Sequence, residues 1–281
     1  GPDGTLATTP TDIADDTPRA TPSYRYAPDE AHTPTSAEDS NDDLWKRHPD
    51  LAWSAPVEDT HLTFTTPAAT ATSVYAGSGS VDLWLRSTAT DTDLEAVLTE
   101  VRPDGHEVYV QSGWLRASHR ALDEDRSTPL RPWPTHREGD AAPLPAGELT
   151  PVRMELFPFA HVVRPGSRLR LTIQAPGGNQ PLWDFASLPG EATNEVGHSG
   201  GHPSSVALPL LPGDPDLVAA LPDDAPSCTV PEVTVQAQSL RLQPCRDDRA
   251  PRRATGVTAV AGADDGTVDV AWAPPEPWSD G

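Results

Sequence analysis

Residues 83–120, LWLRSTATDTDLEAVLTEVRPDGHEVYVQSGWLRASHR, decide the fold class of this chain. The first run extends upstream, so that residues 81–87 (VDLWLRS) place an apolar side chain at every second position, the period of a strand with one buried face. Two further runs, residues 93–101 and 106–112, flank the tripeptide Pro-Asp-Gly at 103–105. Because proline suits the first corner of a turn and glycine tolerates positive φ, this arrangement predicts a β-hairpin.

The same period of two continues on both sides of this stretch. It is present in residues 61–66 (HLTFTT), 114–120 (WLRASHR), 152–157 (VRMELF), 167–173 (SRLRLTI) and 204–211 (SSVALPLL). The chain also contains 33 prolines, which interrupt helices because proline lacks the backbone N–H donor. Short strands with Gly/Pro turns between them predict an all-β fold, a jelly-roll β-sandwich of two antiparallel sheets. Residues 121–147 are predicted to form a long surface loop.

The charge balance excludes two classes of partner. The 281 residues include 42 acidic and 20 basic side chains, a formal net charge of −22. A protein that binds a nucleic-acid backbone or an anionic lipid surface needs clustered Lys and Arg to neutralise phosphates. No apolar run approaches the roughly 20 residues of a membrane span. We therefore expect neither nucleic acid nor a membrane as a partner.

The two cysteines, Cys228 and Cys245, are the whole cysteine content of the chain. They lack the spacing of a metal site, and no histidine pattern accompanies them, so the pair is predicted to form one disulfide in an oxidising compartment. The bond would close a small hairpin between them. Two unpaired thiols are the alternative.

Residues 197–201, Gly-His-Ser-Gly-Gly, match the G-x-S-x-G pattern that exposes the nucleophilic serine of α/β-hydrolases. That chemistry requires a buried strand before Ser199 and a helix after it. Here the polar run PGEATNEV precedes the motif, and His202-Pro203 leads into a predicted strand. Ser199 is therefore predicted to lie in a glycine loop, and no catalytic residue is expected in this chain.

Two other patterns point weakly to metals. His198 and His202 have the i, i+4 spacing of a helical metal pair, but Pro203 and the intervening glycines prevent that helix. Asp91 and Asp93 are too few for a calcium cage, which needs six or more oxygen ligands. We predict a loop ahead of a strand at Asp91 and Asp93, and neither a metal nor a cofactor.

Tryptophan side chains can stack on sugar rings, and four of them are candidates for such a platform: Trp84, Trp114, Trp133 and Trp183. Packing in the core or anchoring of loops is the commoner role for tryptophan. If these side chains stack on sugars instead, the chain would be a carbohydrate-binding module of a secreted enzyme, and this is the alternative function.

Several strings together resemble the C-terminal β domain of the Xaa-Pro dipeptidyl-peptidase and cocaine-esterase-like (CocE/NonD) family of serine hydrolases. The hallmarks are Asp91-Thr92-Asp93, residues 101–105 (VRPDG) and residues 113–116 (GWLR). Residues 158–178 and 202–212 continue the resemblance in the same order. Upstream, residues 24–35 (YRYAPDEAHTPT) resemble the segment that enters that domain, with Ala27 and Glu30 departing from the family pattern.

The resemblance implies a galactose-binding-like jelly roll that packs on an α/β-hydrolase domain of the same protein. The catalytic triad belongs to that other domain, and no residue here matches it. The substrate of the whole enzyme would be a small molecule or a peptide, cleaved at an ester or amide bond. Residues 34–45 would border the acyl pocket, with Leu44 and Trp45 as apolar contacts, although the acidic SAEDSNDD departs from the family there.

The expected organisation has four parts. Residues 1–55 form an extended arm from the hydrolase domain, 56–212 the jelly roll, and 213–250 a linker with the disulfide-closed hairpin. Residues 251–281 resemble the first two strands of a fibronectin type III module. Both ends of the chain are interpreted as cuts, and the cysteine pair with the fibronectin-like segment favours a secreted protein.

Overall fold

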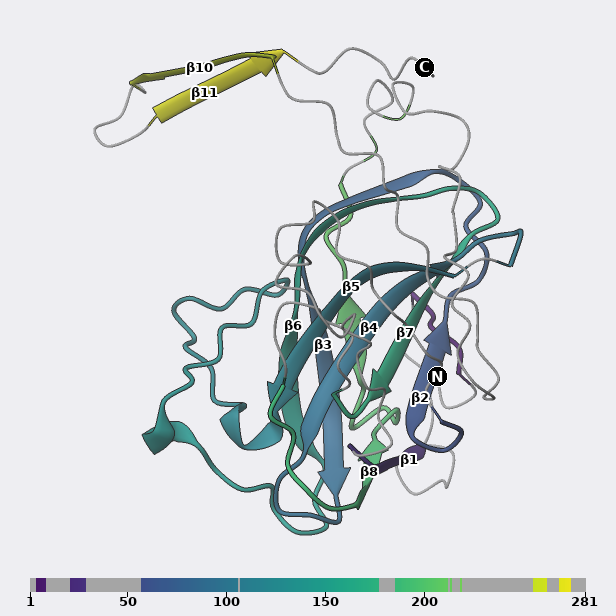
Figure 1. Ribbon diagram of the computed structural model, residues 1–281, viewed down its shortest axis with the longest axis vertical. Coiled ribbons are helices and arrows are strands. Elements are labelled where there is room, and N and C mark those ends of the chain that lie inside the picture. The colour runs from purple at the N-terminus through teal and green to yellow at the C-terminus, as the bar shows by residue number, and fades with distance from the viewer. Residues whose placement is uncertain are drawn as a thin grey trace, which may run out of the picture.

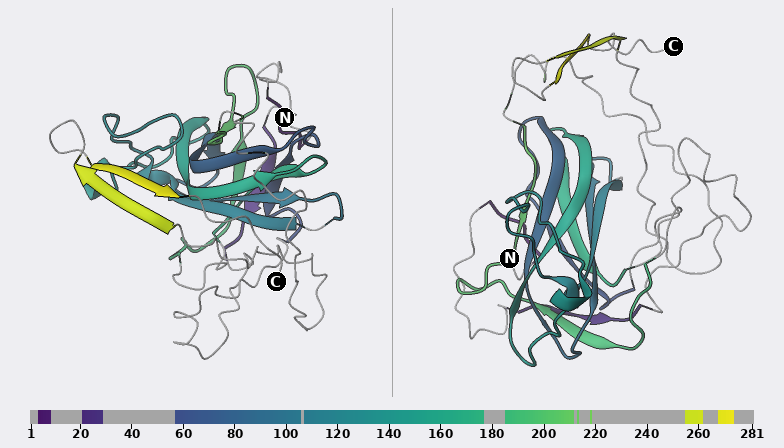
Figure 2. Two further views of the ribbon diagram at one scale, coloured as in Figure 1. Left: turned by 90° about the horizontal axis from the view of Figure 1, so that it is seen from above. Right: turned by 90° about the vertical axis from the view of Figure 1, so that its left-hand side faces the viewer.

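The computed structural model describes residues 4–8, 21–28, 57–105, 107–176, 185–211, 213, 218, 255–261 and 268–273. Within them the chain is almost entirely β, and two antiparallel sheets face each other across a common core (Figures 1 and 2). The all-β sandwich predicted from the sequence is therefore confirmed. The jelly-roll connectivity stays a prediction.

The first sheet has the order β1-β8-β3-β6, and β9 pairs with β3 beside β8. Its strands are β1 (Ser23–Tyr26), β3 (Ser73–Ser87), β6 (Thr150–Val163), β8 (Ala192–Val196) and β9 (Ser205–Ala207). The second sheet has the order β2-β7-β4-β5. Its strands are β2 (His61–Thr65), β4 (Asp93–Val101), β5 (Glu107–Arg116) and β7 (Arg168–Gln174).

Strands β4 and β5 form the hairpin that the Pro-Asp-Gly corner predicts. The amide of Gly105 donates to the carbonyl of Arg102 at 3.0 Å, and Gly105 adopts a φ of +87°. An antiparallel ribbon of β10 (Thr255–Ala261) and β11 (Val268–Ala273) is described further along the chain. Its assignment to a fibronectin type III module stays a prediction.

The core lies between the sheets and follows the alternation of the sequence. Val81, Leu83 and Leu85 of β3 are buried, while the side chains between them are partly exposed. The other main contributors are Leu94, Ala96, Leu98, Leu115, Val152, Met154, Leu156, Leu169, Leu171, Ile173 and Val196. Burial of these side chains is the main stabilising term of the sandwich.

Residues 121–147 form a loop, as predicted, with the short 3-10 helix η4 (Glu138–Asp140). Leu122 and Pro134 make an isolated bridge, and the buried Leu144 inserts into the core. The predicted strand over 114–120 is wrong in its second half. After Arg116 the chain turns into the 3-10 helix η3 (Ala117–His119), because backbone amides there bond back to the loop before β4.

The strand β1 shows that part of the predicted arm belongs to the sandwich. It pairs with β8 in antiparallel register, and Tyr24 and Tyr26 are almost completely buried. The four proposed domain boundaries themselves stay predictions. No helix in the described portion of the chain is long and apolar enough to cross a membrane.

Candidate functional site

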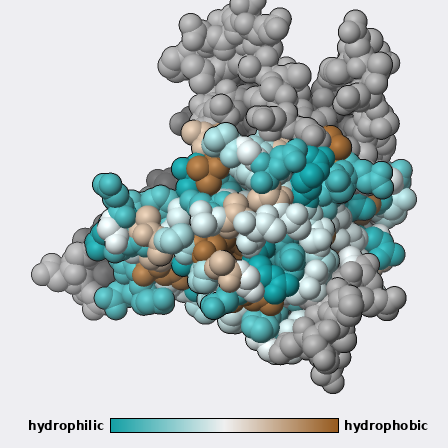
Figure 3. All heavy atoms as spheres, turned by 90° about the horizontal axis from the view of Figure 1, so that it is seen from below, coloured by the Kyte–Doolittle hydropathy of each residue, from teal (hydrophilic) through white to brown (hydrophobic). Residues whose placement is uncertain are grey.

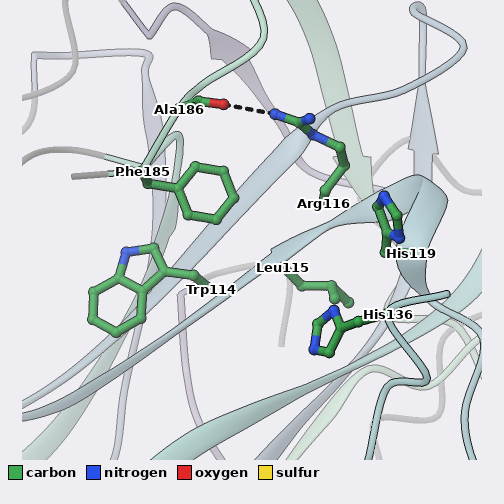
Figure 4. Close-up of a pocket in the computed structure, with 7 residues that line it drawn as sticks. All are labelled: Trp114, Leu115, Arg116, His119, His136, Phe185 and Ala186. Atoms are coloured by element: carbon green, nitrogen blue, oxygen red, sulfur yellow. Dashed lines mark hydrogen bonds between the residues drawn. The ribbon is translucent and has the colours of Figure 1, made fainter. Parts of the chain in front are cut away.

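A pocket of about 280 Å³ opens where β5 ends (Figure 4). The last three residues of β5 line it, namely Trp114, Leu115 and Arg116, and His119 comes from η3. His136 comes from the 121–147 loop, and Phe185 and Ala186 come from the segment before β8. The pocket thus joins three segments that are far apart in the sequence.

Arg116 is fixed by a buried carboxylate. Its Nε donates to Asp93 Oδ1 at 2.7 Å, and one terminal nitrogen reaches the carbonyl of Ala186 at 2.7 Å. Asp93 is fully buried and also accepts the amide of Leu188 at 2.6 Å and the Tyr26 hydroxyl at 3.3 Å. The Asp93 hydrogen bond and charge raise the pKa of Arg116. One carboxylate therefore ties β4, β5, β1 and the segment before β8 together.

The neighbouring hallmark residues have structural partners as well. Asp91 Oδ1 accepts the amides of Thr92 and Ser118, which holds the start of η3. The Thr92 hydroxyl accepts the side-chain amide of Asn194, and that amide also donates to the buried Tyr24 hydroxyl, both at 3.0 Å. Desolvation raises the pKa of Tyr24 far above its usual value, so the hydroxyl stays protonated. Asp91 lies in the predicted loop ahead of a strand, whereas Asp93 is the first residue of that strand, β4.

The predicted tryptophan platform is divided among separate segments. Trp114 packs against Phe157 with ring centroids 5.4 Å apart, and Trp84 on β3 meets the His202 ring at 4.8 Å. Two guanidinium groups lie over the Trp133 ring, that of Arg126 at 3.8 Å and that of Arg131 at 4.6 Å from its centroid. Trp183 lies outside the described residues. Of the three described rings, that of Trp114 lines the pocket.

The G-x-S-x-G motif forms a turn in which residues 197–199 are buried and Gly200 and Gly201 are exposed. Ser199 is 2% exposed, and its hydroxyl accepts the backbone amide of His202 at 3.1 Å. The His198 ring packs edge-on against Phe64, and its Nε2 is buried without a partner in the described structure. Burial lowers the pKa of His198 to about 4, so the imidazole is neutral at pH 7. A buried serine in a turn is consistent with the loop that the sequence predicts.

Four candidate residues predicted from the sequence lie outside the described residues: Leu44, Trp45, Cys228 and Cys245. Both the cleft contacts and the disulfide stay predictions. Among the residues that are described, no group of three His, Cys, Asp or Glu side chains is arranged to hold a metal. Sequence reasoning missed His119, His136 and Phe185 as neighbours. The only signal toward them was Arg116, within the GWLR hallmark.

The fold and the site define a class of protein: a β-sandwich domain in which the carboxylates of Asp91 and Asp93 accept structural hydrogen bonds. The sequence model of the X-Pro dipeptidyl-peptidase C-terminal non-catalytic domain matches residues 4–207. The chain belongs to this family, as the resemblance predicts.

Similar proteins include named esterases. The chain is 36% identical over 135 residues to a protein of Mycobacterium bovis named as a serine esterase, a match covering 47% of the chain and 21% of that protein. It is 27% identical over 165 residues to the cocaine esterase of a Rhodococcus strain, covering 54% of the chain and 26% of the esterase. The chain thus spans about a fifth to a quarter of these relatives.

Solved structures share the fold. A CocE/NonD family hydrolase from Staphylococcus aureus superposes with a TM-score of 0.55 at 19% identity, covering 75% of this chain and 35% of the hydrolase. An α-amino acid ester hydrolase superposes with a TM-score of 0.53 at 20% identity, covering 74% of this chain and 35% of the hydrolase. At these identities the likeness concerns the fold alone.

Proposed function

We propose that this chain is the C-terminal β domain of a serine hydrolase that cleaves esters, and that it packs on an α/β-hydrolase domain of the same protein. The observation that carries the proposal is the family match over residues 4–207, together with the small share of each relative that the chain covers. The reaction would be acyl transfer to water through a serine ester, with every catalytic group supplied by the partner domain.

The choice of esters over peptides follows the relatives. Those that match in sequence carry esterase names, whereas the family description refers to Xaa-Pro dipeptidyl-peptidases. Cleavage of a dipeptide from an Xaa-Pro amino terminus is therefore the second substrate class. Both bonds are cleaved through the same kind of acyl intermediate, so a direct comparison of leaving groups separates them.

The test compares the longer polypeptide, in which an α/β-hydrolase domain precedes this chain, with the 281-residue chain alone. Both are assayed with p-nitrophenyl butyrate and with an Xaa-Pro-p-nitroanilide. The longer protein is expected to hydrolyse p-nitrophenyl butyrate faster than the Xaa-Pro-p-nitroanilide. The chain alone is expected to hydrolyse neither substrate faster than buffer does. Hydrolysis by the chain alone that Ser199→Ala abolishes would overturn the proposal.

We further propose that residues 34–45 border the acyl pocket of the whole enzyme, through Leu44 and Trp45. Apolar side chains at the mouth of a cleft bind the acyl group and exclude water. In the longer polypeptide, Trp45→Ala is expected to raise KM for the butyrate ester more than for the acetate ester. Equal kinetic constants for the variant and the parent with both esters would contradict this contact.

Secretion is proposed on the cysteine pair together with the fibronectin-like segment, and the cysteine pair can be tested directly. If Cys228 and Cys245 are joined in an oxidising compartment, the purified chain contains no thiol that reacts before reduction. Mass spectrometry after alkylation, with and without reductant, is expected to show two additional alkyl groups only in the reduced sample. Alkylation of both cysteines without reductant would contradict the disulfide.

A further inference from the structure

The pocket at the end of β5 separates two kinds of side chain. In Figure 4 the rings of Trp114 and Phe185 lie on one side, and the imidazoles of His119 and His136 lie on the other, with Arg116 and Leu115 between them. None of the seven described residues that line it is acidic, although the chain has 42 acidic residues. A flat apolar wall opposite hydrogen-bond donors is the arrangement of a site for a planar ligand with a polar end.

The Trp114 ring has a further aromatic contact outside the pocket lining. Phe157 of β6 packs against Trp114 at a ring-centroid distance of 5.4 Å and an interplanar angle of 52°. Figure 3, which shows the lower end of the sandwich, has small hydrophobic groups set among hydrophilic ones. An aromatic ring that enters the pocket would bury apolar surface against Trp114 and Phe185. Side chains that are already packed lose little conformational entropy on binding, and this favours affinity.

Arg116 is preorganised by Asp93 and the Ala186 carbonyl, which engage its Nε and one terminal nitrogen. The other terminal nitrogen, Nη1, has no partner in the described structure. The two oxygens of Asp93 are occupied by Arg116, Leu188 and Tyr26, so the carboxylate is enclosed rather than presented to the pocket. Arg116 therefore offers a donor at fixed geometry.

The two imidazoles are also placed by anchored backbone. Their ring centroids lie 6.5 Å apart, and neither ring has a hydrogen-bond partner in the part of the chain that is described. The amide of Ala117 bonds to Thr92 and that of Thr135 to Ala121, each at 2.9 Å. His136 adopts a φ of +50°, a left-handed conformation that few residues adopt without a compensating contact.

We propose that this pocket binds a small anion that carries a flat apolar ring, such as an aromatic carboxylate. Its ring would lie against Trp114 and Phe185, and its carboxylate would accept hydrogen bonds from His119, His136 and Arg116. An imidazole carries an N–H donor in either charge state, and donors that converge on a carboxylate form the stronger class of hydrogen bond. The volume of about 280 Å³ suits a ligand of one or two rings.

The experiment measures binding of 2-naphthoate to the full 281-residue chain by isothermal titration calorimetry, so it does not depend on the proposed hydrolase function. Saturable binding with one site is expected, and 2-naphthamide is expected to bind about tenfold more weakly because it lacks the charge. Equal affinity for the acid and the amide, or no binding of either, would overturn the proposal.

The variants Trp114→Leu, His119→Gln and His136→Asn test the residues one at a time; asparagine tolerates the left-handed backbone at position 136. Each is expected to weaken 2-naphthoate binding about tenfold. Trp84→Leu on β3 and His202→Gln in the loop before β9 change a matched tryptophan–histidine pair away from the pocket and are expected to leave binding unchanged. Equal losses in both groups would refute this site.

A second arm distinguishes a ligand pocket from an interdomain contact. In the longer polypeptide, 2-naphthoate is expected to bind with the affinity measured for the chain alone. If the longer protein does not bind it, the pocket is covered by a side chain of the other domain, and the proposal of a free ligand site is wrong.

Discussion

At the residue scale, Asp93 is a fully buried carboxylate that accepts hydrogen bonds from Arg116, Leu188 and Tyr26. In Asp93→Asn an amide nitrogen replaces one acceptor oxygen and Arg116 loses its counter-charge. The free energy of unfolding is expected to fall by about 2 kcal/mol, as measured by urea titration. Asp82→Asn, at a partly exposed ion pair with Arg153, is the control and is expected to cost less than about 1 kcal/mol. Equal losses would contradict the role given to Asp93.

His198 makes a separate residue-scale prediction, on pH. Burial lowers its pKa to about 4, below the ordinary value of 6.5. The unfolded chain therefore binds the proton more readily between these values, and the stabilisation present above pH 6.5 is lost as the pH falls toward 4. From pH 7 to pH 5 this group contributes a loss of about 2 kcal/mol.

His198→Gln is expected to reduce the pH dependence of unfolding by that amount, measured as the difference between urea titrations at pH 7 and pH 5. Gly139→Ala, which changes no titratable group, is the control and is expected to leave the pH dependence unchanged. If the free energy of unfolding of His198→Gln falls between pH 7 and pH 5 by as much as that of the parent chain, another group is responsible for the pH dependence.

At the element scale, β5 and β6 approach so closely that position 113 accepts only glycine. A Cβ built on Gly113 would lie 1.9 Å from the carbonyl oxygen of Glu155. Gly113→Ala must move one strand, at an expected cost of about 1–3 kcal/mol in unfolding free energy. Gly139→Ala, where a Cβ meets nothing within 4 Å, is expected to change stability little. A Gly113→Ala protein as stable as the Gly139→Ala protein would show that the strands yield without cost.

The strands themselves could be predicted because their signals are local. The alternation in residues 81–87 and the turn residues at 103–105 act within a few positions, and both predictions are confirmed. The bend after Arg116 could not be predicted, since the amides of Ala117 and Ser118 turn toward acceptors on another segment. The pocket was missed for the same reason, because His136 and Phe185 lie in loops that only the tertiary fold brings together.

At the scale of the whole molecule, the sandwich is completed by residues far upstream of its main body. The Tyr24 hydroxyl accepts a hydrogen bond from Asn194, 170 positions away, and the amide of Arg25 bonds to the carbonyl of Asp59 at 2.8 Å. Composition marks residues 1–55 as an arm rich in Thr, Pro and Asp. Only the pairing with β8 shows that the segment holding β1 is a structural strand of the domain.

A pair of neighbouring substitutions on β1 tests this conclusion in the full chain. Tyr24 is 2% exposed, so Tyr24→Ala leaves a cavity beside Asn194 and is expected to lower the free energy of unfolding by about 3–5 kcal/mol. Arg25→Ala removes ion pairs to the exposed carboxylates of Asp59 and Glu191, and is expected to cost less than about 1 kcal/mol. Urea unfolding of both variants gives the comparison. If Tyr24→Ala costs no more than Arg25→Ala, β1 is dispensable, and the sandwich is stable without residues 21–28.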